Sequence, residues 1–501
     1  MKKIICLILA LLMMLSFTAC TDIFKPSPDD SEENGTNASM PDETEEDVED
    51  TTTEAPTTEE PTTEGATTED PFADKESAPK YNGVFQTGYA REVITPSVPT
   101  GQFEEVMNDL YATCVAVYDG EKTILLVSID IGSIMEDKCD SIRNKIKSAT
   151  KIPTDNIFIS ATHNHSSIHF GVSSVWDFNA YNKIANAAKN AIADLSDTEM
   201  FIGTAKTTGM AFVRRYVDAN GNYATVNPGT YDTVELDPAT TKCVGEADDT
   251  LQVVRFVREG KTDIVAANWQ AHLAHAVNEY PKAFSADLAH YMRTDVEARD
   301  DVKVIYFAGA SGNINLTPPN DAARKYQDHI EVGRALASLT LEAIKEENLT
   351  PIEAGKIEIT KETYNAKYAK NTPEEIAAAK DRLSRGEGGT LSLKVDEMIV
   401  ARTKATSADL RLASLSIGDL ALITVPYEMF DTNGMQIKEE SPFKMTLILT
   451  NSDGAWIYMP SYKAATEYGG YDAQYTYFEV GTAEKLVAEY LRMLKEFREA
   501  D

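Results

Sequence analysis

Residues 156–169 read NIFISATHNHSSIH, in which an apolar run from Asn156 to Ser160 is closely followed by three histidines. The run is short and rich in branched and aromatic side chains, which favours a buried β-strand that ends where a loop begins. In extended geometry the i, i+2 spacing of His163 and His165 places both imidazoles on one face of the chain. The stretch therefore predicts histidines that stand together at the edge of a sheet.

A second histidine block, NWQAHLAH at residues 268–275, follows the strand-like run 262–267 in the same way. In α/β folds ligands bind at the carboxyl edge of the strands. Imidazole is the commonest metal ligand and the side chain best suited to proton transfer near neutral pH. Five of the seven histidines fall in these two blocks, which favours a metal site over local hydrogen bonding, the alternative for a lone His-x-His. His169 and His275 are interpreted as polar loop residues.

Strand-like and helix-like segments alternate along the chain. This interleaving predicts a mixed α/β (α+β) architecture, in which residues 80–501 form one large domain with covered β-sheets. Strands are expected at residues 123–130, 156–160, 201–206, 251–257, 262–267, 302–307, 357–360, 397–403, 410–416, 420–425 and 445–450, and helices at 137–150, 181–195, 286–298, 330–346 and 482–497.

The N-terminus has the pattern of a bacterial export signal. Two lysines precede the apolar run 4–17, which is too short to remain as a membrane span. Thr18-Ala19-Cys20 then resembles a lipoprotein lipobox, with Phe17 where leucine is usual. We expect residues 1–20 to be a lipoprotein signal peptide and lipidated Cys20 to anchor the protein to the outer face of the cell membrane. An ordinary secretory signal with an incidental cysteine is the alternative.

Residues 21–79 are dominated by Thr, Glu, Asp and Pro and hold 20 acids and 2 bases, a net charge of −18. Such a segment buries too little apolar surface to offset the entropy of ordering, so we expect a disordered acidic spacer. The whole chain carries −33 and residues 1–20 carry +2, which leaves −17 for residues 80–501. An acidic domain argues against nucleic-acid binding and is not attracted to anionic lipid headgroups. The lipid anchor is therefore the only membrane contact that we expect.

Two motifs carry a resemblance to a known family. Residues 88–96, GYAREVITP, resemble the opening strand and Ile-Thr-Pro turn of neutral (non-lysosomal) ceramidases and their bacterial relatives. Residues 157–166, IFISATHNHS, are similar to that family's Ala-Thr-His-Thr-His-Ser signature. The resemblance extends from about residue 83 to residue 491. It implies a ceramidase-like catalytic domain, bound Zn²⁺ and hydrolysis of an amide or ester in a small-molecule or lipid-like N-acyl substrate.

Carried over by position, the resemblance implies a zinc site with catalytic neighbours. His165 matches a polar catalytic residue and Arg214 an active-site arginine, although from the residues alone Arg214 reads as a salt-bridge partner and Glu428 as a surface carboxylate. Two histidines, a carboxylate and a phenol would leave zinc an open position for water, whose pKa it lowers to about 7. The implied ligands are His163, His272, Glu428 and Tyr458, the last of which requires a two-residue insertion in the alignment.

One departure from the family bears on the reaction. Ceramidases have Gly-Asp-Val-Ser-Pro with a catalytic serine, whereas residues 312–316 read GNINL, so Asn315 occupies the serine position and Asn313 that of the aspartate. An amide binds a substrate by hydrogen bonds but is neither a nucleophile nor a proton shuttle. Asn315 is thus the third expected catalytic residue and also the reason for an alternative, a catalytically silent surface binding protein. A third hypothesis, a hydrolase of sugar or cell-wall N-acyl groups, differs only in pocket shape.

Overall fold

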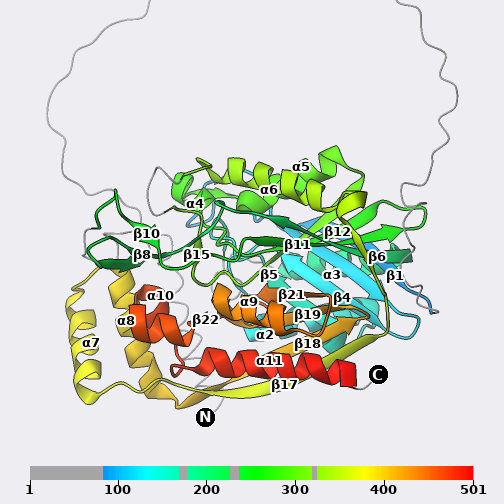
Figure 1. Ribbon diagram of the computed structural model, residues 1–501. Coiled ribbons are helices and arrows are strands. Elements are labelled where there is room, and N and C mark those ends of the chain that lie inside the picture. The colour runs from blue at the N-terminus through cyan, green and yellow to red at the C-terminus, as the bar shows by residue number, and fades with distance from the viewer. Residues whose placement is uncertain (1–82, 169–177, 226–235, 319–323, 500–501) are drawn as a thin grey trace, which may run out of the picture. The chain divides into compact units, whose positions relative to one another are not determined.

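The computed structural model describes residues 83–168, 178–225, 236–318 and 324–499 (Figure 1). In this part of the chain two β-sheets pack face to face and helices cover the outer face of each, so the predicted mixed α/β class is confirmed. The predicted signal peptide, Cys20 and the acidic spacer lie outside the described residues. None of the helices in these ranges combines the length and the apolarity that crossing a membrane requires.

The larger sheet has nine strands of mixed pairing. They are β1 (Gln86–Val93), β3 (Tyr111–Tyr118), β4 (Thr123–Ile129), β5 (Ile157–Ala161), β6 (Ser196–Lys206), β11 (Thr250–Arg258), β12 (Asp263–Trp269), β14 (Val302–Ala308) and β16 (Thr350–Ile352). The strand order is β14-β12-β11-β6-β1-β3-β4-β5, with β16 paired to β6 beside this path. The pairs β4/β5 and β12/β14 are parallel, whereas the other pairs in this sheet are antiparallel.

The smaller sheet lies against one face of the larger one. It contains β17 (Ile357–Lys367), β18 (Ser407–Ile417), β19 (Leu420–Val425) and β21 (Met445–Thr450) in that order, with β19 and β21 parallel. Val115 and Phe256 of the larger sheet share one apolar cluster with Leu415 and Leu422 of the smaller. Because alternate residues of a strand point to opposite faces, the remaining apolar positions of each sheet face the helices.

Helices cover both outer faces. On the larger sheet, α2 (Glu136–Thr150) and α3 (Phe178–Ala193) pack at the β3–β5 end, and α5 (Asp287–Arg299) and α6 (His329–Ala343) pack on β11, β12 and β14. On the smaller sheet lie α9 (Asp431–Glu440) and α11 (Thr482–Glu499), with α8 (Thr390–Ala401) in the same apolar cluster. Further elements are α4 (Ala276–Glu279), α7 (Pro373–Arg385), α10 (Tyr471–Gln474), β2 (Glu105–Val106), β7 (Phe212–Val213), β8 (Arg215–Val217), β9 (Tyr223–Thr225), β10 (Lys242–Cys243), β13 (Ala283–Phe284), β15 (Ile314–Asn315), β20 (Tyr427–Met429) and β22 (Trp456–Met459).

One predicted strand is wrong. Residues 397–403 lie at the end of α8 and in the 3₁₀ turn after it. The buried positions Leu391, Val395 and Met398 recur every three or four residues, which is the period of a helix. The window 397–403 contains only the last of these positions, so its apolar residues resemble a strand when they are taken without the turns that precede them.

The carboxyl ends of the parallel strands meet at one place. β4 ends beside β5, β12 beside β14, and β19 beside β21. Main-chain contacts join these ends: the Ala161 N–H donates to the Asn451 carbonyl (3.1 Å), and a parallel bridge links Asn164 with Leu273. The loops that leave these strands therefore border a common region.

A buried ion pair fastens the chain after β21 to α2. Arg143 on α2 pairs with Asp453, and both side chains are less than a tenth exposed. Arg143 Nε also donates to the carbonyl of Ile157 (3.0 Å), and Asp453 accepts from the N–H of Ile159 (3.4 Å). Removing one member of such a pair leaves the other charge buried without its partner.

Arg143→Met should lower the free energy of unfolding by about 3 kcal/mol, because Asp453 stays buried without a cation. The control is Arg411→Met: Arg411 also pairs with an aspartate, Asp140 (2.7 Å), but its side chain is 43% exposed. Its loss should cost about 1 kcal/mol or less. Urea unfolding followed by circular dichroism measures the free energy of unfolding of both variants. Equal decreases would show that the buried Arg143–Asp453 pair stabilises the fold no more than the exposed pair does.

Candidate metal centre

His163 lies just beyond β5 in a backbone conformation that few residues adopt. Its φ of +59° is in the left-handed region, so the extended geometry predicted between His163 and His165 does not hold. Its Nδ1 faces the carbonyl of Gly132 at 2.8 Å. Because a carbonyl only accepts, Nδ1 carries the proton in the neutral ring and Nε2 presents its lone pair. The ring is thus oriented to bind through Nε2.

His272 follows β12 and is held in the same manner. Its Nδ1 faces the carbonyls of Ser311 (2.8 Å) and Ile314 (3.1 Å), in the segment that follows β14. Nδ1 is again the donor in the neutral ring, which leaves Nε2 as the ligand atom. Both rings are buried, and the centroids of the His163 and His272 rings lie 4.8 Å apart. The two histidine blocks therefore meet, as the sequence predicted.

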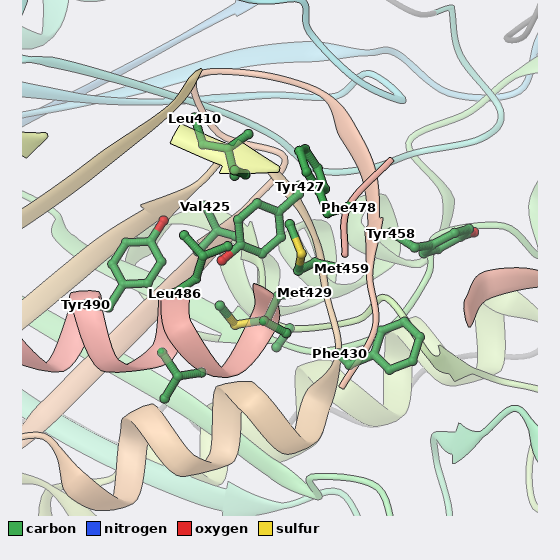
Figure 2. Close-up of a cluster of buried hydrophobic side chains, with 14 of the residues drawn as sticks. Leu410, Val425, Tyr427, Met429, Phe430, Tyr458, Met459, Phe478, Leu486 and Tyr490 are labelled. Atoms are coloured by element: carbon green, nitrogen blue, oxygen red, sulfur yellow. The ribbon is translucent and has the colours of Figure 1, made fainter. Parts of the chain in front are cut away.

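Glu428 is the third side chain beside His163 and His272. Its neighbours on β20, Tyr427 and Met429, point into the hydrophobic cluster drawn in Figure 2. Strand alternation turns the Glu428 carboxylate the other way. Its Oε2 lies 3.1 Å from Nε2 of His272 and 3.3 Å from Nε2 of His163. Two ring nitrogens and one carboxylate oxygen thus converge, although the residues come from distant parts of the chain.

The electrostatics of this group suit a cation. Burial opposes ionisation of Glu428, but the charge of His163 and the hydrogen bonds from His163 and His272 together hold the pKa of Glu428 well below its usual range. Burial and the nearby Arg214 lower the pKa of His272 to about 4. Against burial, Glu428 raises the pKa of His163. Two imidazole nitrogens and a carboxylate oxygen at this spacing repel one another unless a proton or a metal ion lies between them, and such donors suit zinc and other divalent transition metals.

His165 stands at the rim of the group and is half-buried. Its Nε2 lies 3.4 Å from Nε2 of His163, and its backbone N–H donates to the carbonyl of Leu273 (2.8 Å). One ring nitrogen from each of His163, His165 and His272 can be chosen so that all three lie within 4.8 Å of one another, close enough to hold a metal ion. The geometry thus offers His165 either as a further ligand or as a proton carrier beside the ion.

Arg214 and Tyr458 form the next wall of the site. Tyr458 is the partner of Glu428 in the parallel pair of β20 and β22. The Arg214 guanidinium lies 4.9 Å from the centroid of the Tyr458 ring, and it donates to the carbonyl of Gly312 and to Asp472 (3.1 Å). Burial alone would lower the pKa of Arg214, but Tyr458 and Asp472 raise it, so the group keeps its positive charge next to the metal centre.

Asn315, the residue at the family's serine position, lies one residue after a carbonyl that orients His272. It is half-buried, and its Oδ1 accepts from the N–H of Thr317 at 3.3 Å. Asn313 faces α9 instead. Its amide donates to Asp431 (2.6 Å), and its oxygen accepts from the Asp431 N–H (2.8 Å). The two asparagines are therefore tied to different elements.

Sequence reasoning did not identify the residues that orient the site. Gly132 and Ser311 act through main-chain carbonyls, which any residue type supplies. Asp472 pairs with Arg214 (3.1 Å) and with Arg215 (2.6 Å) and is fully buried, but in the sequence it is one acid among many. No sequence motif or periodicity marks any of these three positions.

Gly312 is the one orienting position with a sequence signal. A Cβ at this position would lie 2.6 Å from the carbonyl oxygen of Glu428 and 2.9 Å from that of Met429, so no other residue type fits without displacing β20. The Gly312 N–H donates to the Met429 carbonyl (2.7 Å). Glycine therefore allows the segment after β14 to press against β20, the strand that carries Glu428.

Comparisons with known proteins place the fold. No family model and no curated protein sequence matches the chain. The crystal structure of neutral ceramidase from Pseudomonas aeruginosa matches it with a TM-score of 0.61 and 15% identity, over 84% of this chain and 75% of that chain. A ceramidase structure described as complexed with C2 matches with a TM-score of 0.60 and 14% identity, over 84% and 76%. The chain therefore has a neutral ceramidase-like fold, as motifs 88–96 and 157–166 predicted.

His163→Ala and His272→Ala are each expected to abolish stoichiometric binding of a divalent metal, because each removes one of the two converging Nε2 atoms. The measurement loads purified protein with Zn²⁺, dialyses it and quantifies the metal by mass spectrometry. The control, His290→Ala on α5, removes a ring that packs on Tyr291 (5.0 Å between centroids) and should leave the metal content unchanged. Full metal content in both site variants would show that these imidazoles hold no ion.

Proposed function

We propose that the protein is a zinc-dependent hydrolase that cleaves an amide or ester bond of a small-molecule or lipid-like N-acyl substrate with water. The observation that carries this proposal is the convergence of two imidazole Nε2 atoms on one oxygen of Glu428, at 3.1 and 3.3 Å. His163, His272, Glu428 and Tyr458 would hold the ion. When bound, Zn²⁺ supplies a Lewis acid and lowers the pKa of a water molecule.

The likeness to ceramidases and the residues of the site support different parts of the proposal. Both solved structures that match the chain are described as ceramidases. Because their identity to this chain is 15% or less, the likeness supports only the fold. Support for the reaction comes from the side chains of the candidate metal centre. His163, His272 and Glu428 converge in space, which supports the ligand roles that the resemblance implies for them.

Arg214 and His165 supply what hydrolysis needs beside a metal. Cleavage of an amide passes through a tetrahedral intermediate whose former carbonyl oxygen is negative, and preorganised donors stabilise that charge. Arg214 is held in place by Asp472 and by the carbonyl of Gly312, and it remains charged. The half-buried ring of His165 is placed to carry a proton to the leaving nitrogen.

A second candidate function is a surface binding protein without turnover. The observation that favours it is Asn315, whose amide bonds to Thr317 and neither attacks a carbonyl nor transfers a proton. A third candidate, a hydrolase of sugar or cell-wall N-acyl groups, uses the same metal chemistry. N-acyl amides, ceramides, esters and N-acetylated sugars, assayed at full zinc occupancy, separate the three. No turnover of any compound favours the binding protein, and turnover of the sugars alone favours the third candidate.

Arg214→Met is expected to lower kcat on an accepted substrate by about 100-fold or more with a smaller change in KM, since one preorganised donor to the oxyanion is lost. The control is Arg299→Met, which removes an exposed arginine of α5 that bonds to Ser338 (3.2 Å) and should leave kcat unchanged. Zinc content is measured in parallel, so that a lost ligand is distinguished from a lost donor. An unchanged kcat in Arg214→Met with zinc retained would remove Arg214 from the mechanism.

We also propose that residues 80–501 form a hydrolase domain held outside the cell by lipidated Cys20 and the spacer 21–79. In the native host, Cys20→Ser should abolish incorporation of labelled palmitate and release the protein from the membrane fraction, because the acyl chains on Cys20 provide the anchor. The control is Cys243→Ser, which removes a free thiol of the domain and should change neither property. A membrane-bound Cys20→Ser variant would refute the lipid anchor.

A further inference from the structure

Loop 311–315 follows β14 and orients the ring of His272. The Nδ1–H of this ring donates to the carbonyls of Ser311 and Ile314, at 2.8 and 3.1 Å. Groups that hold the far nitrogen of a metal-binding histidine fix its tautomer and its direction, and their loss typically lowers metal affinity about 10- to 100-fold. The position of this loop therefore bears directly on the Nε2 atom that would bind the ion.

The same loop also lies against β20. The Gly312 N–H donates to the carbonyl of Met429 (2.7 Å), the residue that follows Glu428. Arg214 binds the loop as well: its guanidinium donates to the Gly312 carbonyl, and its backbone N–H donates to the carbonyl of Asn313 (2.9 Å). All of these contacts use main-chain atoms of the loop. The loop thus touches the oriented histidine, the strand of Glu428 and the arginine beside them.

The side chain of Asn313 adds a second link between this loop and the chain that follows Glu428. Its amide donates to Oδ1 of Asp431 (2.6 Å), and its own Oδ1 accepts from the backbone N–H of Asp431 (2.8 Å). The same Asp431 oxygen accepts from the N–H of Thr432 (2.7 Å). Both side chains of the Asn313–Asp431 pair are buried, so removing one partner leaves the other without its hydrogen bonds and without water to replace them.

Asp431 is a firm attachment point because α9, which it begins, is fixed at its other end. Lys438 in the last turns of the helix pairs with Asp248 (2.9 Å), and both side chains are mostly buried. The same ammonium group donates to Gln270 (3.4 Å), on the chain that leads from β12 to the second histidine block. Ile437 is fully buried in the apolar cluster between α9 and the smaller sheet. A loop bonded to Asp431 is therefore held in register with both sheets.

We propose that Asn313 and Asp431 are positioning residues of the candidate metal centre. Their paired side chains hold loop 311–315 on Nδ1 of His272 and thereby raise the affinity of the centre for a divalent ion. This inference rests on the proposed function, because it requires that the centre binds a metal. A pair that only stabilised the fold would change the free energy of unfolding and leave the affinity of the folded protein for zinc unaltered.

Competition with a zinc chelator, measured on the purified full chain, tests the pair. Asn313→Ala and Asp431→Ala each remove the side-chain bond, and each should lower the affinity for Zn²⁺ about tenfold or more. Asp431→Asn keeps an oxygen for the Asn313 amide and should stay within about threefold of the wild type. The double alanine variant should bind zinc no more weakly than the weaker single variant, because the two residues act as a unit.

The matched control is Arg258→Met at the far end of β11. Arg258 is a buried arginine that pairs with Asp194 (2.6 Å), and the register of β11 on β12 places it at the end away from His272. Its loss should lower the free energy of unfolding in urea but leave the zinc affinity unchanged. If Asn313→Ala does not fold, Asn313→Ser takes its place, since its shorter side chain also withdraws from Asp431.

A second readout follows the hydrogen bond itself. In zinc-loaded protein labelled with ¹⁵N-histidine, the Nδ1–H signal of His272 is identified by its absence in His272→Ala. In Asn313→Ala this proton should exchange faster with water than in the wild type, because its two carbonyl acceptors are no longer held in place. The control Arg258→Met should leave the exchange rate unaltered.

The outcomes separate this inference from the proposed function. Wild-type protein that binds no zinc would overturn the metal centre and the positioning role together. Tight binding by the wild type with unaltered affinity in the folded Asn313 variant would overturn the positioning role alone. So would an equal loss of affinity in Arg258→Met, or additive losses in the double alanine variant.

Discussion

The candidate metal centre depends on one constraint: the parallel strands of both sheets end at the same place. Each strand end releases a loop, and each loop supplies one part of the site. The loop after β5 carries His163, the loop after β12 carries His272, and the chain after β19 carries Glu428. The segment after β14 supplies the carbonyls that orient His272. Because the backbone ladders fix the register of each pair, the sheets bring together groups that no local structure connects.

Local pattern predicted the strands before His163 and His272, because a strand buried on both faces leaves a continuous apolar run. The same reasoning could not place Glu428. It stands on β20, which has only three residues and therefore no period to detect, and its partners are remote in sequence. The family resemblance, rather than periodicity, named Glu428 and Tyr458. The strand predicted at 397–403 is wrong for a different reason. This window contains only the last turn of α8, which is too short to show the period of a helix.

Orientation of the centre depends mostly on main-chain groups. The left-handed backbone at His163 aims its ring, and the carbonyl of Gly132 fixes which nitrogen carries the proton. The missing side chain of Gly312 lets the next segment press against β20. Strained backbone of this kind persists only where the surrounding structure imposes it, and here the converging ladders do so. These determinants leave almost no trace in residue type, which explains why the histidine blocks could be recognised in the sequence but the groups that orient them could not.

The shared carboxylate of Asp472 has a consequence for the chemistry of the pocket. Asp472 pairs with both Arg214 and Arg215, and Glu428 faces His163 and His272, so the formal charges of these two guanidinium groups and two carboxylates sum to zero. A divalent ion in such neutral surroundings would keep its whole charge, in a medium that screens it poorly. Small anions would then be drawn to the centre, including the carboxylate that an amide or ester hydrolase releases. Under the proposed hydrolase function, charge neutrality in the pocket would therefore favour inhibition by the acid product and by buffer anions such as acetate.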